Sequence, residues 1–491
     1  MVRSDIRSYL TIAKRELCEA PTSWLAFSAL LAWMFGLYWS DLFVFRLTTT
    51  SFEFLELRAL WLAVEAVALL VLYFGLLRVL KHSSGVAVVA GTFLFVGSIL
   101  VLFAPSGFAF DGMRIVGVVL TGLGGAALLA LLGIRYARKG PKLLLVNVAL
   151  ALFVAALFDS ILLYLPLDLQ LMIVALLPVV CVALYVASAR NNAVAEGLID
   201  GSTSTEAVEV FTTNSTKINI IRIVALPLIV GLAYGLMQRL TSDAYTSGAA
   251  GVNTATIVSF FLSSVFIALA ALFIDSRKLI KLVCFAAIPT VGIAFVMLPL
   301  FSDAREAAQA ICIIGFNSFY FMVWALWAGD RAEPSLPKRF VLGLFVLVGA
   351  ESLGSVLGVP VVAALDDSGS TLAVVSLVVV YLLLMAGIFS FDRSGTVDQE
   401  QQAVVGAELS GQIAMGDRDL DIWVQRYGLS ARETEVFELL AKGRNRVFIS
   451  KALFISDNTT RTHMKNIYRK LDVHSQQELI DLLEEERKKP V

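Results

Sequence analysis

Long apolar runs, each about as long as a membrane-crossing helix, fill the greater part of this 491-residue sequence. A helix needs about 20 mostly apolar residues to cross a bilayer. Charged residues, Pro or Gly separate the runs, and the pattern predicts twelve spans: 22–45, 57–80, 85–104, 112–136, 141–165, 168–189, 218–240, 251–275, 279–300, 304–329, 338–360 and 371–391. The polar segment 190–217 divides them into two sets of six. Equal sets of this kind indicate a duplicated architecture.

Composition agrees with the pattern. Apolar residues make up 58% of the sequence and charged residues 16%, and the mean hydropathy is +0.80. These values lie outside the usual range of water-soluble domains, so we expect a multi-pass protein with the lipid bilayer as a partner. The four cysteines are scattered without CxxC spacing, and they predict neither a disulfide framework nor a metal site. No cofactor is expected.

The N-terminal segment 1–20 carries many charges and has no short apolar core before a small-residue cleavage site, so it does not resemble a secretory signal. Its apolar residues recur at roughly helical spacing between basic ones. This pattern is compatible with an amphipathic helix lying on the membrane surface. A partly ordered basic tail is the alternative.

Lys and Arg are distributed unevenly between the two sets of loops that alternate along the chain, and cytoplasmic loops carry the excess of these residues. One set holds basic residues in every loop. The opposite set holds only Arg46, Arg58, Arg114, Arg239 and Arg305. The first set is therefore predicted to be cytoplasmic, and an even number of crossings then leaves both termini in the cytoplasm.

Six plus six spans with a long cytoplasmic central loop resemble, in topology, the major facilitator superfamily of transporters over residues 20–391. The resemblance implies an all-α bundle with a membrane domain at 21–393, halves at 21–189 and 218–393, and a loop at 190–217. The loop after the second span, "GLLRVLKHSSG", lacks the Asp of that family's G-x-x-x-D-R-x-G-R-K motif. The corresponding "IDSRKLIK" in the second half keeps an Asp, an Arg and a Lys.

Three carboxyl groups fall inside predicted spans, where ionisable side chains are costly and mark functional positions by default. They are Glu65, Asp159 and Glu351, and all three could face one cavity. By the family resemblance, Asn317 in the tenth span joins them. Two interpretations stay open: these residues line a ligand site open to the outside, or they hold helices together through hydrogen bonds. The Gly-rich stretch 117–133 indicates close helix packing.

After the last span the composition changes to that of a small soluble helical domain. Acidic residues and glycines in 394–426 predict a linker, and the domain is expected at 427–491. Ser430 and Glu433 have the S-x-x-E spacing of a capping box at the start of a first helix. Gly443 stands where a left-handed cap would end that helix.

A second short helix is predicted over "RVFISKAL", and a third over 458–471, capped by Ser456 or Asp457. The third helix contains four basic residues and no acidic one: Arg461, Lys465, Arg469 and Lys470. Ser475 and Glu478 repeat the capping-box spacing and open a fourth helix. A short helix, a tight turn and a basic helix form the helix-turn-helix plan, whose second helix enters the major groove of DNA.

The stretch "LSARETEVFELLAKGRNRVFISKALFISDNTTRTHMKNIYRKLDVHSQQELI" closely resembles the LuxR-type DNA-binding domain over about sixty residues. The resemblance implies that Arg461, Thr462 and Lys465 face base edges of double-stranded DNA, whereas Thr459, Arg469 and Lys470 contact phosphates. Phosphate neutralisation supplies most of the affinity and its salt dependence. Relative to the family pattern, Thr460 replaces Val, and Phe448 stands where charged residues are common.

Helix-turn-helix proteins commonly bind two-fold operators as dimers, so a homodimer on DNA is expected. The fourth helix could form the contact through Leu479, Leu482 or Leu483. Alternatively, these leucines close the core of the domain itself.

A DNA-binding domain, here called the reader, joined to a membrane bundle favours a one-component transcription regulator that senses an unknown small-molecule ligand in the bundle. Chains of this kind resemble regulators of bacteria, which implies the cytoplasmic (inner) membrane. The alternatives are a transporter with a regulatory DNA-binding domain and a tether of DNA to the membrane. An enzyme is not expected, because the sequence contains no nucleophile–base pair, metal spacing or nucleotide loop.

Overall fold

The computed structural model describes residues 21–39, 51–104, 111–197, 221–241, 250–273, 279–301, 305–328, 335–365, 369–388 and 423–441, and most of 444–483. The predicted segment 1–20, most of the loop 190–217 and residues 394–422 of the predicted linker lie outside these ranges. The chain divides into two compact units, Met1–Phe391 and Asp392–Val491. Each unit is described by itself.

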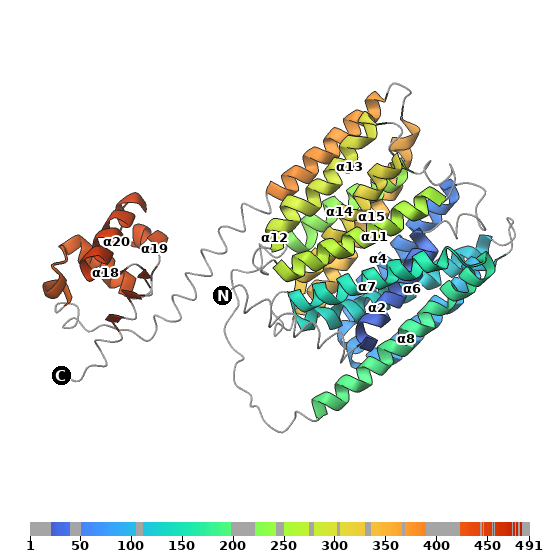
Figure 1. Ribbon diagram of the computed structural model, residues 1–491, viewed down its shortest axis with the longest axis horizontal. Coiled ribbons are helices and arrows are strands. Elements are labelled where there is room, and N and C mark those ends of the chain that lie inside the picture. Colours follow the sequence, from blue (N-terminus) through green and yellow to red (C-terminus); the bar gives the residue numbers. More distant parts are fainter. Residues whose placement is uncertain are drawn as a thin grey trace. The chain divides into compact units, whose positions relative to one another are not determined.

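The first unit is a bundle of long apolar helices (Figure 1). Eleven helices among the described residues are long and apolar enough to cross a membrane, and each overlaps one predicted span. The first predicted span corresponds to α2 and a π-helical turn η1, which are not among the eleven. The helices are α2 (Pro21–Met34), η1 (Phe35–Trp39), α4 (Ser51–Lys81), α5 (Ser83–Leu102), α6 (Asp111–Lys139), α7 (Pro141–Leu162), α8 (Leu167–Gly197), η3 (Ile221–Ala225), α10 (Leu226–Leu240), α11 (Ala250–Phe273), α12 (Leu279–Leu282), η6 (Val283–Ala287), α13 (Ile288–Leu300), α14 (Arg305–Ala328), α15 (Leu336–Ala363) and a last helix, Ser370–Ile388.

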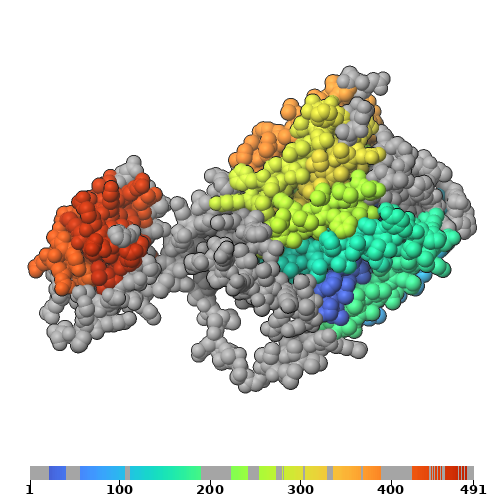
Figure 2. Space-filling view, in the orientation of Figure 1, coloured from blue at the N-terminus to red at the C-terminus, as the bar shows by residue number. Residues whose placement is uncertain are grey.

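The same helix pairings recur in both halves of the bundle. In the first half α6 packs against α4 and α5, and in the second half α14 packs against α11 and α13. The halves meet where α4 packs against α15 and α7 against α11. Figure 2 shows α7 (teal) and α11 (yellow-green) side by side along this boundary. Repeated pairings of this kind are what the predicted duplication requires.

The outer faces of the spans are apolar. Val71, Phe74 and Leu77 on α4 are 66%, 81% and 77% exposed. Large apolar side chains are rarely exposed side by side on a soluble protein, whereas a bilayer covers them without cost. The exposed side chains therefore fit a helix that faces lipid.

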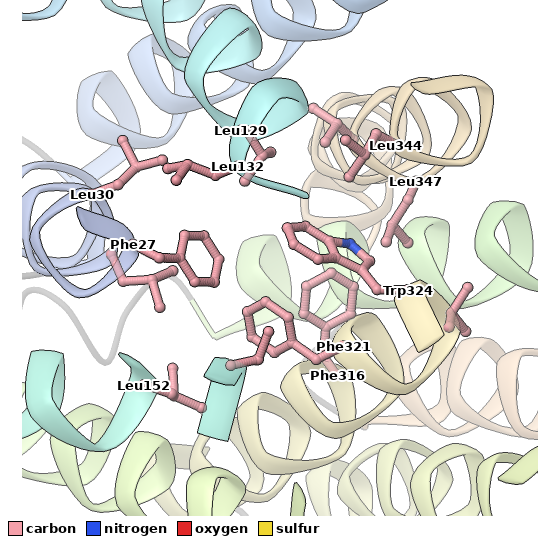
Figure 3. Packing of buried hydrophobic residues seen from close by; sticks show 14 of the residues in the cluster. Phe27, Leu30, Leu129, Leu132, Leu152, Phe316, Phe321, Trp324, Leu344 and Leu347 are labelled. Atoms are coloured by element: carbon pink, nitrogen blue, oxygen red, sulfur yellow. The ribbon is translucent and has the colours of Figure 1, made fainter. Parts of the chain in front are cut away.

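Aromatic side chains from both halves meet at the centre of the bundle (Figure 3). The Phe27 ring on α2 lies 5.8 Å from the Trp324 ring and 6.2 Å from the Phe321 ring on α14. Leucines of α6 and α15 close this cluster from the sides: Leu129, Leu132, Leu344 and Leu347. Dispersion contacts between these side chains hold the two halves together at this level.

Glycines allow several helices to approach closely. A Cβ at Gly235 of α10 would lie 2.0 Å from the Glu351 carbonyl oxygen of α15, and one at Gly117 of α6 would lie 2.8 Å from the Gly97 carbonyl oxygen of α5. Real Cβ atoms do not come this close to backbone atoms. The predicted packing role of the Gly-rich stretch 117–133 is therefore confirmed at Gly117.

The second unit contains α18 (Ala431–Ala441), α19 (Arg446–Ala452) and α20 (Asp457–Leu471), drawn in orange-red in Figure 1. These helices agree with the first three of the four predicted for the C-terminal domain. A preceding helical turn spans 423–427. All three helices pack on one another around a core formed by Trp423, Leu429, Val436, Phe437, Leu440, Ala441, Ile449, Ile467, Leu471, Val473, Leu479 and Leu483.

Candidate functional site

The bundle encloses a cavity between its halves that three of the four predicted ligand residues line. Glu65 comes from α4, Asn317 from α14 and Glu351 from α15. About 50 Å³ of this cavity is open to water-sized molecules, which is room for a few waters or one small organic group. Glu65 is 1% and Glu351 4% exposed, so both carboxyl groups lie deep inside the protein.

Aromatic rings form much of the cavity wall. Trp61 stacks on Tyr38, with ring centroids 4.0 Å apart, and Trp39 meets Trp61 edge to face at 5.7 Å. Tyr320 lies against Trp324 at 5.5 Å. Because each ring is fixed by others, the wall has little freedom to collapse when a ligand enters or leaves.

Arg58 is a buried member of this site that the sequence interpretation missed. Its guanidinium donates hydrogen bonds to Glu351 Oε1 at 3.0 Å and to Gln238 Oε1 at 2.9 Å, and it lies over the Trp39 ring at 4.6 Å. These contacts join α4 of one half to α10 and α15 of the other. Arg58 precedes Glu65 by seven residues, a spacing that places both on one helix face. That spacing is the signal that the sequence offered.

Asp159 does not share the cavity with the other carboxyl groups, so the expectation of one common cavity is wrong for this residue. It lines a second, smaller cavity of about 30 Å³, together with Gln170 and Thr256. Phe35 and Phe260 border both cavities, and their rings stack with centroids 3.7 Å apart. Within the described residues, neither Asp159 oxygen has a hydrogen-bond partner.

Three arginines that the sequence interpretation counted as loop charges lie inside the bundle. Arg58, Arg114 and Arg239 are 3%, 6% and 2% exposed. Arg114 pairs with Asp111 at 3.2 Å, and Arg239 Nε donates to the Ser355 carbonyl at 3.3 Å. Removing them from the loop count increases the difference in positive charge between the two sides of the membrane.

In the second unit, the predicted capping box is present at the start of α18. The Ser430 amide donates to Glu433 Oε2 at 2.9 Å, and the Glu433 amide donates to Ser430 Oγ at 3.4 Å. Lys470 Nζ also donates to Glu433 Oε2 at 2.6 Å. Burial of the Glu433 carboxyl opposes its ionisation, but the hydrogen bonds from Lys470 and Ser430 outweigh burial and lower its pKa. This network joins α18 to α20.

Two further contacts fix the ends of the short helices. The Arg444 amide donates to the Leu439 carbonyl at 2.9 Å, which is the six-to-one bond of a Schellman motif. Gly443, the predicted cap, lies outside the described residues. Arg432 donates to the Leu453 carbonyl at the end of α19 at 2.8 Å. The hydrogen bond from Arg432 therefore connects α18 to the turn between α19 and α20.

Helix α20 separates a buried face from an exposed basic one. Thr460, Ile467 and Leu471 are 0%, 0% and 4% exposed and face the core. Five of the six predicted DNA-contacting residues have exposed side chains: Thr459, Arg461, Thr462, Lys465 and Arg469. These five side chains form a strip of hydroxyl and cationic groups along α20.

Lys470, the sixth predicted DNA contact, is partly buried. Its ammonium is held by Glu433 and by the Gly428 carbonyl at 2.7 Å. The predicted phosphate contact of Lys470 stays a prediction, and the structure gives this lysine a role inside the domain. Phe448 is 43% exposed, and the Arg444 guanidinium lies over its ring at 4.8 Å, which covers part of its apolar surface.

The leucines proposed for a dimer contact belong to the domain's own core. Leu479 and Leu483 are 0% and 6% exposed, and Leu482 packs against the same cluster. The alternative interpretation, that these leucines close the core of the domain, is therefore confirmed. The capping box predicted for the fourth helix is present in part, because the Glu478 amide donates to Ser475 Oγ at 3.2 Å. A homodimer stays a prediction, with another surface needed for its contact.

Comparison with known proteins matches residues 428–483 to the family described as bacterial regulatory proteins, luxR family. The spore germination protein GerE of Bacillus subtilis is 43% identical over 56 residues, which are 11% of this chain and 76% of that protein. The chain belongs to the luxR family. The uncharacterized response regulatory protein YgeK of Escherichia coli is 46% identical over 52 residues, 11% of this chain and 35% of that protein. The luxR match thus concerns the C-terminal unit.

The membrane bundle is similar to solved transporter structures. A bacterial homologue of the iron transporter ferroportin, in its outward-facing state, is 15% identical, with a TM-score of 0.49, over 77% of this chain and 98% of that chain. The transporter FucP of the major facilitator superfamily, in its outward conformation, is 13% identical, with a TM-score of 0.44, over 75% of this chain and 98% of that chain.

In the luxR unit, Thr460 occupies a buried position at the start of α20. A Thr has nearly the shape of the Val of the family pattern, but its hydroxyl is buried with it, so the substitution adds a polar group to this position. Among the described residues of the chain, no group of three or more His, Cys, Asp or Glu side chains is arranged to hold a metal ion.

Proposed function

We propose that this chain is a membrane-embedded, one-component transcription regulator. A ligand in the central cavity of the bundle changes how the luxR unit occupies double-stranded DNA. The observation that carries the proposal is the fusion itself: one chain joins a luxR reader to a bundle that buries carboxyl groups in a cavity. Sharing one chain makes the conformation of the bundle an input to the reader.

The exposed face of α20 supports the DNA-binding part of the proposal. Arg461, Thr462 and Lys465 are the base-reading residues, and Thr459 and Arg469 contact phosphates. All five side chains are exposed on one helix, and a second helix of a helix-turn-helix pair enters the major groove. Lys470 joins the phosphate contacts when a phosphate competes with Glu433 for its ammonium.

The contacts across the bundle support the sensing part. Arg58 of the first half is bound to Glu351 and Gln238 of the second half beside the cavity. A ligand that competes for either carboxyl group, or adds contacts across the boundary, changes the relative stability of two arrangements of the halves. Sensing requires such a differential contact with two states.

The location of the reader follows from the loop charges. With Arg58, Arg114 and Arg239 buried, the loops on one side contain nearly all the remaining Lys and Arg of the membrane domain. We infer that this side is the cytoplasm of a bacterium, that both termini lie there, and that the protein resides in the inner membrane.

The proposal is tested by mapping DNA occupancy in living cells by crosslinking and sequencing, with the full chain at native level. Wild type should occupy discrete promoters, and Arg461→Ala should lose them. Arg426→Ala, which removes an exposed arginine outside α20, is the matched control and should keep them. Equal occupancy by Arg461→Ala and wild type would remove the DNA-reading claim.

The same cells test sensing. Occupancy is compared with and without each compound that stabilises the purified bundle against unfolding. Unchanged occupancy under every stabilising compound would remove the sensing claim. Uptake of those compounds into vesicles containing the chain distinguishes a sensor, which binds without accumulation, from a transporter with a regulatory domain.

A further inference from the structure

Three polar groups of the central cavity, one carboxyl group and two donors, have no hydrogen-bond partner among the described residues. Glu65 is 1% exposed, and no described residue donates a hydrogen bond to its carboxyl group. On the same cavity, Trp61 Nε1 and Asn317 Nδ2 are buried donors without an acceptor among the described residues. Buried polar groups are normally hydrogen-bonded. A ligand that satisfies this site therefore offers a positive donor to Glu65 and an acceptor to Trp61 and Asn317.

The charges of the cavity point the same way. Glu351 is paired with Arg58 at 3.0 Å, whereas no described basic side chain forms an ion pair with Glu65. The two carboxyl groups also interact electrostatically with each other. An isolated buried carboxylate is strongly unfavourable. An ionised Glu65 therefore needs a counter-charge that the described residues do not provide, and a bound cation would supply it.

The aromatic wall favours an organic cation over a metal ion. Cations with a diffuse charge bind to the faces of Trp, Tyr and Phe rings. One ring of this wall, Trp39, already holds a cation in this way, because the Arg58 guanidinium lies 4.6 Å from its centroid. Trp61 and Tyr320 present further rings to the same space. A hard metal ion would instead require several oxygen ligands.

We infer that the central cavity binds a small organic monocation that also carries a hydrogen-bond acceptor, such as a hydroxyl or carbonyl oxygen. The cation lies against the aromatic wall with Glu65 as its counter-ion, and its acceptor reaches Trp61 and Asn317. The inference rests on the proposed function, because it names the class of ligand that the proposed sensor takes.

The test uses the purified full chain in lipid nanodiscs and three probes. Choline is an organic cation with a hydroxyl group, and 3,3-dimethyl-1-butanol is its neutral isostere. Tetramethylammonium is a cation without an acceptor. Dissociation constants are obtained from the shift of the thermal unfolding transition, followed by tryptophan fluorescence. Choline should bind more tightly than tetramethylammonium, and both should bind more tightly than the neutral isostere.

Two variants test the assigned counter-ion. Glu65→Gln keeps the size of the side chain and removes its charge, and should weaken choline binding by about thirtyfold or more while leaving the neutral isostere unaffected. Asp111→Asn, which removes a carboxylate that is 47% exposed at the end of α6, is the matched control and should bind choline as wild type does. A protonated, neutral Glu65 would give no preference for the cation.

The outcomes separate this inference from the proposed function. Equal binding of choline and its isostere in wild type would overturn the inference, as would a cation preference that survives Glu65→Gln. If neutral or anionic compounds stabilise the bundle and change DNA occupancy, sensing stands and the ligand class is wrong. If cations bind through Glu65 and occupancy never changes, the ligand class stands and sensing is wrong.

Discussion

The buried ion pair between Arg58 and Glu351 gives the sharpest prediction about the stability of the bundle. The two side chains are 3% and 5% exposed, and the pair joins the two halves at 3.0 Å. Glu351→Gln leaves the guanidinium buried without its counter-charge. Removing one member of a buried pair costs about 3–5 kcal/mol of unfolding free energy. We expect the lower end, about 3 kcal/mol, because Gln238 and the Trp39 ring still contact the guanidinium.

A double-mutant cycle isolates the interaction of the pair. The variants are Arg58→Met, Glu351→Gln and the two together, and their unfolding in mixed micelles with increasing SDS is followed by tryptophan fluorescence. The double variant should be more stable than the sum of the two single effects predicts, because it leaves no unpaired charge. Asp111→Asn removes a carboxylate that is 47% exposed from its pair with the buried Arg114, and should cost less than Glu351→Gln, because one member of this pair is already in contact with solvent.

Two results would refute this reasoning about the pair. If Glu351→Gln costs no more than Asp111→Asn, burial does not strengthen the interaction. If the two single effects simply add, Arg58 and Glu351 act independently and do not lock the halves together.

Four further predictions concern the DNA contacts of the luxR unit, its stability at low pH, the packing of the bundle and the orientation of the chain. Arg461→Ala and Lys465→Ala should each weaken DNA binding and relax sequence preference, because both residues are assigned to base edges. Arg469→Ala, at an assigned phosphate contact, should weaken binding to all sequences and reduce the dependence of log affinity on log salt by about 1. Affinity measured for several sequences over a salt series checks both expectations. The pKa of Glu433 is lowered from its ordinary value of 4.5. The stabilising contribution of this carboxylate is therefore complete above that value and is lost as the pH falls through the lower pKa of the folded state. Unfolding of the luxR unit, followed by circular dichroism, should show this loss in wild type but not in Glu433→Gln. Gly235→Ala should abolish stable folding, because its Cβ would meet the backbone of α15 at 2.0 Å. Gly125→Ala is the control and should be tolerated, because the nearest contact of its Cβ is at 3.8 Å. Expression followed by size-exclusion chromatography distinguishes the two outcomes. Protease added outside intact cells should leave the luxR unit attached, and its release would contradict the inferred orientation.

The helices could be read from the sequence because their physical causes are local. About twenty consecutive apolar residues can form a membrane-crossing helix wherever they occur in the chain, so the spans could be predicted without knowing which helices pack against them. The capping box of Ser430 and Glu433 is likewise contained within four residues. The charge asymmetry of loops is also local, although it misassigned Arg58, whose partners lie about 180 and 293 positions away in the chain.

The sites were only partly predictable, because they depend on contacts between distant segments. The sequence placed Glu65 and Glu351 inside spans, as ligand-binding or helix-pairing groups, but it did not indicate that Arg58 pairs with Glu351 and not with Glu65. It also could not show that the stacked rings of Phe35 and Phe260 lie between Asp159 and the central cavity. In the reader, the helical period separated the exposed residues of α20 from the buried ones. The bond from Lys470 to Glu433 spans 37 positions and was not foreseen.

The central claim is that the bundle and the luxR unit are energetically coupled, and coupling between two binding sites is reciprocal. The most direct measurement is therefore the affinity of the bundle for a stabilising cation, in the full chain in nanodiscs, with and without a DNA fragment from an occupied promoter. We expect the fragment to change this affinity by about fivefold or more, and we expect Arg461→Ala to remove the change. An identical affinity with and without bound DNA would contradict it.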